Sequence, residues 1–219
     1  MSKGSFISPE QRSGMRARVE PLALAMARAG LTPNMLTLIG FGIASLGGLM
    51  AALEWWLLAA IVATAGAGFD MFDGAVARAT GQVSRLGAFM DSVFDRWGEG
   101  VVYAGIVIGC TRAGFDLGAW LAATALVSAF MVSYARAKSE SLGFSSGSGM
   151  AAIGFAPREV RTVILGIALL GAGLLGGVSE DIGDLGTLVL AAGLGLIALL
   201  ATITVVQRVL FVVAQPRDG

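Results

Sequence analysis

The chain has 219 residues, of which 56% are hydrophobic and only 14% are charged. Soluble domains carry about 25% charged residues, so the composition excludes an ordinary soluble protein and predicts one integral membrane domain, residues 1–219. Histidine is absent and Cys110 is the only cysteine. This excludes a histidine base, a phosphohistidine intermediate and an intrachain disulfide.

The first 33 residues are predicted to be a cytoplasmic juxtamembrane segment. The start is polar and basic and lacks the pattern of a cleavable signal peptide. Residues 9–28 place Leu22, Leu24 and Met26 among arginines, which predicts a short amphipathic helix lying along the membrane interface. A plain juxtamembrane tail is the alternative.

The rest of the chain predicts an all-α fold with six membrane-spanning helices of about 20 residues or more. Their expected ranges are 35–53, 55–79, 86–111, 116–139, 159–178 and 185–213. If both termini share one side, that side carries all 15 Lys and Arg residues except Arg112. The positive-inside rule then places both termini on the cytoplasmic side of the cell (inner) membrane.

Small residues are dense in these helices, as at Gly47-Gly48, residues 65–68, and Gly105 with Gly109. In membranes such residues allow helices to pack closely. Packing within one chain is the favoured interpretation, and a homodimer is left open.

Four aspartates lie in or beside these apolar segments: Asp70, Asp73, Asp91 and Asp95. A charge at bilayer depth costs about 2.5–3.5 kcal/mol on insertion scales, so the cluster predicts an active site. The i, i+3 and i, i+4 spacings put each pair on one helix face. Because a short cytoplasmic turn joins the two helices, all four carboxylates should meet near the cytoplasmic surface.

Four close carboxylates repel one another unless cations lie between them. Two metal ions about 3.5–4 Å apart would relieve the repulsion, and oxygen ligands favour Mg²⁺ or Mn²⁺. Gly74, Ala77 and Gly87 have small side chains or none, which allows another helix or a flat ligand to come close. Arg78 is placed to bind a phosphate. The alternatives are buried salt bridges to Arg78 and Arg96, or a divalent-metal transporter. The scarcity of charge in the outer halves of the helices argues against transport.

A second basic group falls at the cytoplasmic ends of the fourth and fifth predicted helices. Arginine suits bidentate phosphate binding, so these residues predict a pocket for a phosphorylated acceptor. Plain positive-inside anchoring is the alternative. The group consists of Arg136, Lys138, Arg158 and Arg161.

The aspartate spacing resembles the signature of the CDP-alcohol phosphatidyltransferase family, Asp-x₂-Asp-Gly-x₂-Ala-Arg-x₈-Gly-x₃-Asp-x₃-Asp. Every fixed position is filled between Asp70 and Asp95, and the Thr32-Pro33-Asn34 stretch agrees with it. The resemblance implies that Asp70, Asp73 and Asp91 are metal ligands. Asp95 would be the general base and a further ligand.

The resemblance also implies a CDP-lipid site and a reaction. The site would be formed by Thr32, Pro33, Asn34, Met35, Gly74, Ala77, Arg78, Ser84 and Gly87. The reaction would transfer the phosphatidyl group of CDP-diacylglycerol to an alcohol and release CMP. The expected partners are therefore CDP-diacylglycerol, an alcohol and membrane lipid, with no nucleic acid.

The acceptor is indicated by a closer resemblance. The run Ser133–Lys138 is similar to the phosphatidylinositol phosphate synthases of actinobacteria, which implies myo-inositol phosphate as the acceptor. That branch usually has Arg-Pro-Glu-Arg, whereas this chain has Arg158-Glu-Val-Arg161 with proline at 157. Glycerol 3-phosphate is the alternative. Glu99, one turn beyond Asp95, is either catalytic or packs against Arg96, and the structural role is favoured.

Overall fold

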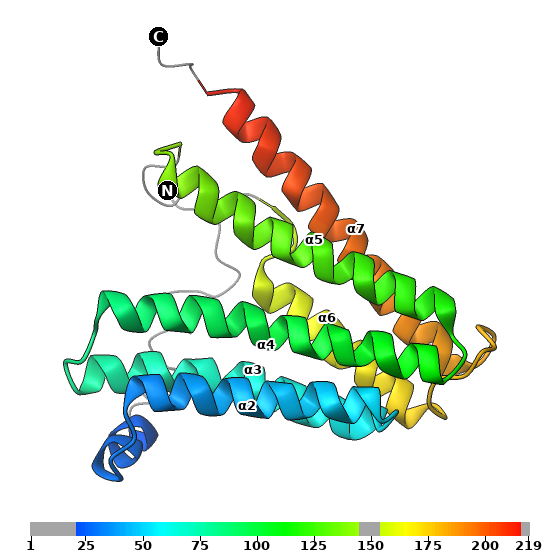
Figure 1. Cartoon of the computed structure of the whole chain (residues 1–219), viewed down its shortest axis with the longest axis horizontal. Coiled ribbons are helices and arrows are strands. Elements are labelled where there is room, and N and C mark those ends of the chain that lie inside the picture. The colour runs from blue at the N-terminus through cyan, green and yellow to red at the C-terminus, as the bar shows by residue number, and fades with distance from the viewer. Residues whose placement is uncertain (1–20, 145–153, 216–219) are drawn as a thin grey trace.

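The computed structural model describes residues 21–144 and 154–215, and of Asp70 only the backbone. These parts of the chain are helical and contain no strand. Six long helices follow one another (Figure 1): α2 (Pro33–Ala52), α3 (Trp56–Ala79), α4 (Arg85–Arg112), α5 (Asp116–Ser141), α6 (Arg158–Leu174) and α7 (Leu185–Val213). The predicted all-α class is confirmed, and the predicted helix ranges agree to within a few residues.

The largest difference in range lies at the end of α6. The sequence predicts a helix to residue 178, whereas α6 ends at Leu174. Gly176 and Gly177 have φ values of +104° and +88°, which an α-helix does not allow. Two successive glycines in this region therefore end the helix early.

The N-terminal prediction falls mainly outside the described residues, which begin at residue 21. Residues 21–28 are helical, and Ala23 is fully buried in a small cluster with Leu36 of α2 and Val76 of α3. In Figure 1 this short segment lies against one end of the α2–α3 pair. The predicted amphipathic helix over residues 9–28 stays a prediction.

The helices form two groups that meet through α6 and through the contact of α4 with α5. Helices α2, α3 and α4 lie side by side, and α5 with α7 is tilted away from them at one end (Figure 1). Helix α6 packs against α3 in the first group and α7 in the second. The main hydrophobic core, which includes Tyr103, Ile106, Leu169 and Leu194, draws residues from both groups.

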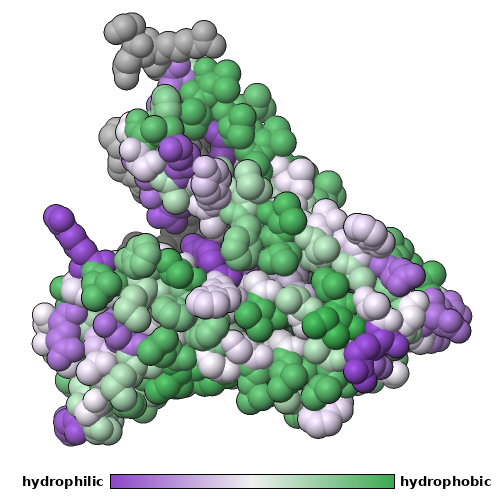
Figure 2. Space-filling view, in the orientation of Figure 1, coloured by the Kyte–Doolittle hydropathy of each residue, from purple (hydrophilic) through white to green (hydrophobic). Residues whose placement is uncertain are grey.

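Within the described residues, four helices are long and apolar enough to cross a membrane: α2, α3, α5 and α7. Helix α4 has 28 residues, but its first half carries four charged side chains. Helix α6 has 17 residues. Figure 2 shows hydrophobic residues over most of the visible face, with hydrophilic ones near the ends and in the hollow between α4 and α5. This distribution is that of a membrane protein, with apolar side chains facing outward along the helices.

Candidate active site

The aspartate motif begins at the end of α3 that lies beside the start of α2. Asp73 is only 6% exposed. Its carboxylate accepts a hydrogen bond from Thr37 Oγ1 of α2 at 2.8 Å and another from the backbone N–H of Gly74. Asp70 lies one turn earlier in α3, and its side chain is outside what the structure describes. Thr37 thus fixes the Asp73 carboxylate from a neighbouring helix.

The residues predicted to bind the CDP-lipid gather at the same ends of α2, α3 and α4. Thr32 caps α2 through a bond from the Met35 N–H to its hydroxyl, with Pro33 in the first turn. Ser84 caps α4 by accepting the Gly87 N–H at 2.9 Å. These capped helix starts hold the two chain segments in place.

Two glycines of the motif are closely approached by polar side chains. A Cβ atom added at Gly74 would lie 3.1 Å from Nη1 of Arg78. A Cβ added at Gly87 would lie 3.6 Å from the Asn34 side-chain oxygen. The structure thus brings Arg78 over Gly74 and Asn34 towards Gly87. An added Cβ at Gly74 would require a small shift of the Arg78 side chain, whereas one at Gly87 would make an ordinary contact with Asn34.

Asp91 and Asp95 lie on successive turns of α4, and the structure pairs Asp95 with two cations. Arg158 Nη1 of α6 donates to Asp95 Oδ2 at 2.6 Å, and Arg96 Nη1 lies 3.3 Å from the same oxygen. Arg96 also donates to the Ser133 hydroxyl of α5 at 3.1 Å. Asp91 is half-buried. Asp95 therefore lies where α4, α5 and α6 approach one another.

Glu99 forms a second ion pair one turn further along α4. Arg161 of α6 donates from Nε and Nη2 to the two Glu99 carboxylate oxygens, both at 3.0 Å. Arg161 is 1% exposed, so this is a buried, bidentate pair. The sequence-based expectation paired Glu99 with Arg96, and the structure corrects the partner to Arg161. Arg96 is instead turned towards Asp95 and Ser133, to which it donates hydrogen bonds.

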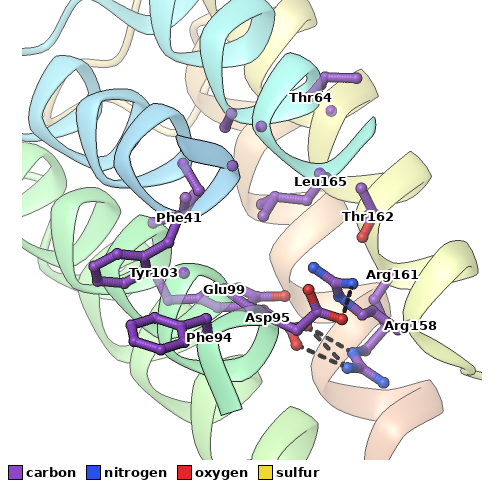
Figure 3. A pocket seen from close by; sticks show the side chains of 18 of the residues that line it. Phe41, Thr64, Phe94, Asp95, Glu99, Tyr103, Arg158, Arg161, Thr162 and Leu165 are labelled. Carbon is purple, nitrogen blue, oxygen red and sulfur yellow. Dashed lines mark hydrogen bonds and ion pairs between the residues drawn. The ribbon is translucent and has the colours of Figure 1, made fainter. Parts of the chain in front are cut away.

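A cavity opens between α2, α3, α4 and α6 beside these ion pairs. Asp95 and Glu99 bond directly to Arg158 and Arg161 in its wall (Figure 3). The deeper wall is apolar and includes Phe41, Val102 and Leu165, with the hydroxyl groups of Thr37, Thr64 and Thr162 among them. A space with charged groups at one end and an apolar lining suits an amphipathic substrate.

The four basic residues predicted for the acceptor do not all reach this cavity. Arg158 and Arg161 line it, whereas Arg136 and Lys138 are not among its lining residues. Arg136 pairs instead with Glu140 on the same helix at 2.9 Å, and both side chains are nearly half exposed. Lys138 is exposed.

The donor chemistry of the motif suits a divalent metal ion. Carboxylate oxygens are the ligands that Mg²⁺ and Mn²⁺ prefer, and no histidine is available. Among the side chains that the structure describes, no three acidic, histidine or cysteine residues are grouped as a metal site. Asp70, the remaining member of the motif, is not among those side chains.

A family model described as CDP-alcohol phosphatidyltransferase matches residues 30–215. The chain belongs to the CDP-alcohol phosphatidyltransferase family. It is therefore an enzyme, and the divalent-metal transporter considered above is wrong. The match includes α2 to α7, the aspartate motif and the arginines of α6.

This transferase has relatives with similar names in archaea and bacteria. It is 36% identical over 199 residues to an archaetidylinositol phosphate synthase of Pyrococcus horikoshii, covering 90% of this chain and 92% of that protein. It is 33% identical over 227 aligned positions to a phosphatidylinositol phosphate synthase of Mycobacterium bovis, covering 99% and 94%. The resemblance to the actinobacterial branch is confirmed.

Solved structures of the Mycobacterium tuberculosis phosphatidylinositol phosphate synthase share the fold of this transferase. The complex with manganese and citrate has a TM-score of 0.79 at 28% identity, covering 92% of this chain and 93% of that one. The structure with CDP-DAG bound has a TM-score of 0.77 at 26% identity, covering 92% and 98%. Divalent metal use therefore occurs within this family.

Two side chains of the cavity could not be identified from the transferase sequence. Thr37 carries no charge and belongs to no motif, so nothing in the sequence marks it as the partner of Asp73. Tyr103 is fully buried, and its hydroxyl has no hydrogen-bond partner in the structure. Only its spacing of four residues from Glu99 hints that it shares the face of α4 that lines the cavity.

Proposed function

We propose that this transferase moves the phosphatidyl group of CDP-diacylglycerol to a hydroxyl of myo-inositol phosphate, giving phosphatidylinositol phosphate and CMP. The names of its archaeal and mycobacterial relatives support the acceptor. They share inositol phosphate and differ only in the lipid. The mycobacterial structure with CDP-DAG bound supports the donor.

The observation that carries the acceptor class is the contact between Arg158 and Asp95. Arg158 Nη1 and Asp95 Oδ2 are 2.6 Å apart. An acceptor whose phosphate group binds Arg158 would therefore have a hydroxyl group close to the Asp95 carboxylate. Arg161 lies beside it in the wall of the cavity. An acceptor held by its phosphate would thus present a hydroxyl to the base, which an alcohol without phosphate could not do as well.

The chain's own residues account for the proton and for the orientation of the acceptor. Asp95 takes the proton of the acceptor hydroxyl, and that oxygen bonds to the phosphorus that carries the diacylglycerol. The bond from this phosphorus to the bridging oxygen breaks, and the electron pair leaves with CMP. Arg78, over Gly74, is placed to bind the pyrophosphate of the donor. Arg136 and Lys138 stay predicted contributors to the acceptor site.

Metal ions would be held by the four aspartates. Asp70, Asp73, Asp91 and Asp95 fit Mg²⁺ or Mn²⁺ because they offer only carboxylate oxygens, and two ions per site are proposed. Such ions neutralise pyrophosphate charge and stabilise a leaving phosphate. Thr37 orients Asp73 for this role by its hydrogen bond of 2.8 Å.

We further propose that all six long helices span the cell (inner) membrane, with both termini and the active site cytoplasmic. The four apolar helices support membrane insertion. Asp95 and Glu99 of α4 would be tolerated because they line the cavity and pair with arginines of α6 rather than facing lipid. The site then lies where the lipid tails of the donor stay in the bilayer and its CDP group reaches water. A homodimer stays a prediction.

The test is an acceptor screen with the purified protein and CDP-diacylglycerol, scored by CMP release. The acceptors are myo-inositol 1-phosphate, myo-inositol, glycerol 3-phosphate and serine, with a reaction lacking acceptor as control. We expect release with myo-inositol 1-phosphate and Mg²⁺ or Mn²⁺, and its loss in EDTA.

Each part of the proposal has a result that would contradict it. Faster turnover with glycerol 3-phosphate than with myo-inositol 1-phosphate would show that glycerol 3-phosphate is the acceptor, while the proposed transfer reaction would stand. Full activity in EDTA would exclude the metal mechanism. Absence of CMP release with every acceptor would exclude the proposed reaction.

A further inference from the structure

We propose that Thr204 of α7 is a positioning residue for the acceptor site. It holds the segment 154–157, which leads into α6, and through that segment it orients Arg161. The inference rests on the proposed function, because it assigns Arg161 to acceptor binding. Thr204 itself is not among the residues that line the cavity, so it would act without touching substrate.

The Thr204 hydroxyl is fully used by contacts with the backbone. Its oxygen accepts the N–H groups of Phe155 and Ala156, both at 3.1 Å. Its own O–H donates to the Leu200 carbonyl at 2.7 Å. A hydroxyl has one donor and two acceptor positions, so every one of them is occupied. Thr204 is fully buried, and no water could replace it without a rearrangement.

The segment also packs directly against the Thr204 methyl group. Gly154 has a φ of +117°, and a Cβ atom added there would lie 2.1 Å from Thr204 Cγ2. Only glycine fits such an approach with this backbone conformation. Thr204 therefore fixes the segment 154–157 both by hydrogen bonds from its hydroxyl and by packing of its methyl group.

The segment in turn holds Arg161. The Ala156 carbonyl accepts a hydrogen bond from Arg161 Nη1 at 2.9 Å, while Nε and Nη2 of Arg161 bond to Glu99 of α4. The guanidinium group is thus held from the segment on one side and from α4 on the other. A planar group with three of its five N–H donors held has a defined orientation in the wall of the cavity that it lines.

The same segment sets where α6 begins. The Pro157 carbonyl accepts the N–H groups of Val160 and Arg161 at 3.1 and 3.3 Å. A movement of the segment would therefore shift the first turn of α6, and with it both arginines of the cavity. Removing the Thr204 hydroxyl leaves the buried Ala156 N–H and the part-buried Phe155 N–H without their acceptor. The segment would have to move to satisfy them.

The experiment compares variants of Thr204 with a matched variant on the same helix. Thr204→Val and Thr204→Ala remove the hydroxyl, and Thr204→Ser keeps it. The control is Thr202→Val, because the Thr202 hydroxyl bonds to Ser128 of α5 at 3.1 Å and neither residue lines the cavity. For each variant KM is measured for myo-inositol 1-phosphate and for CDP-diacylglycerol, together with kcat and the apparent Tm.

We expect Thr204→Val and Thr204→Ala to raise the acceptor KM about tenfold, since a displacement of about 1 Å in a binding group can cost up to about 100-fold. The KM for CDP-diacylglycerol should stay near the wild-type value, and kcat at saturating acceptor should fall by a smaller factor than the acceptor KM rises, because Arg158 beside Asp95 lies in the same turn of α6. Thr204→Ser should restore the acceptor KM, and Thr202→Val should not change it.

Three results would overturn the proposal. The first is an unchanged acceptor KM in both hydroxyl-free variants. The second is an equal rise in the KM of both substrates, or loss of folding in both variants, which would mark Thr204 as merely structural. The third is the same acceptor defect in Thr202→Val. A wild-type protein that does not use the phosphorylated acceptor would instead contradict the proposed function.

Discussion

At the scale of single residues, the site is organised by two ion pairs between α4 and α6. Asp95 with Arg158 and Glu99 with Arg161 lie one turn apart on each helix, at distances of 2.6 and 2.9 Å. A buried ion pair adds little to stability because desolvation offsets the attraction. Since two pairs are kept beside one cavity, we interpret them as acceptor-binding and catalytic groups rather than as supports of the fold.

The first residue-scale prediction concerns the base. Asp95→Asn should lower kcat by about 100-fold or more, because a positioned general base contributes about 10²–10⁴-fold. Binding of CDP-diacylglycerol, followed by its effect on the apparent Tm, should be retained. Asp116→Asn is the matched control, since Asp116 is exposed at the start of α5 and outside the cavity. Normal turnover by Asp95→Asn would show that another group is the base.

At the scale of elements, glycine contacts set the distances between helices. A Cβ atom added at Gly105 of α4 would lie 1.9 Å from the Gly48 carbonyl of α2, and one at Gly66 of α3 would lie 2.7 Å from the Ala44 backbone of α2. Helix α2 is thus packed backbone to backbone against both of its neighbours. The depth and width of the cavity between these helices depend on these contacts.

The prediction at this scale is that Gly105→Ala destabilises the protein. The added methyl group must push α2 and α4 apart, and overpacking of this kind costs about 1–3 kcal/mol. The apparent Tm in detergent should therefore fall. Gly68→Ala in α3 is the control, because no atom lies within 4 Å of its added Cβ. An equal Tm for the two variants would contradict the role assigned to the contact.

At the scale of the whole molecule, charge decides how the bundle lies in the membrane. Arg112 is the one basic residue predicted on the outer side, and the structure pairs it with Glu54 at 3.1 Å. Glu54 lies between α2 and α3, at the end of the bundle away from the aspartates. The charge of Arg112, the one exception to the predicted distribution of basic residues, is therefore balanced by Glu54.

Orientation is tested with single cysteines in a Cys110→Ala background. Gln82→Cys and Ile182→Cys lie in exposed turns separated by α4, α5 and α6. If all three helices span the membrane, the two positions face opposite sides. A membrane-impermeant maleimide should then label only residue 182 in intact cells, and both after lysis. Labelling of both in intact cells would mean that α4 or α6 does not span, and the reverse pattern would invert the topology.

The positions of the helices and the aspartate motif could be predicted from the sequence because each depends on a short stretch of chain. Hydropathy located each helix to within a few residues, except where Gly176 and Gly177 end α6 early. The aspartate spacing led to the family because the motif lies within two successive helices and their turn. These properties belong to neighbouring residues and do not depend on how distant helices pack.

The sequence by itself determined the membrane class and the helices, and it predicted the carboxylates of the candidate active site. Only the tertiary structure decided which distant groups meet them. Thr37 bonds to Asp73, Arg158 reaches Asp95, Arg161 rather than Arg96 pairs with Glu99, and Thr204 holds the segment before α6. These partners are set by the rotation and approach of helices through small residues. A one-dimensional pattern of charge and hydropathy does not record that rotation.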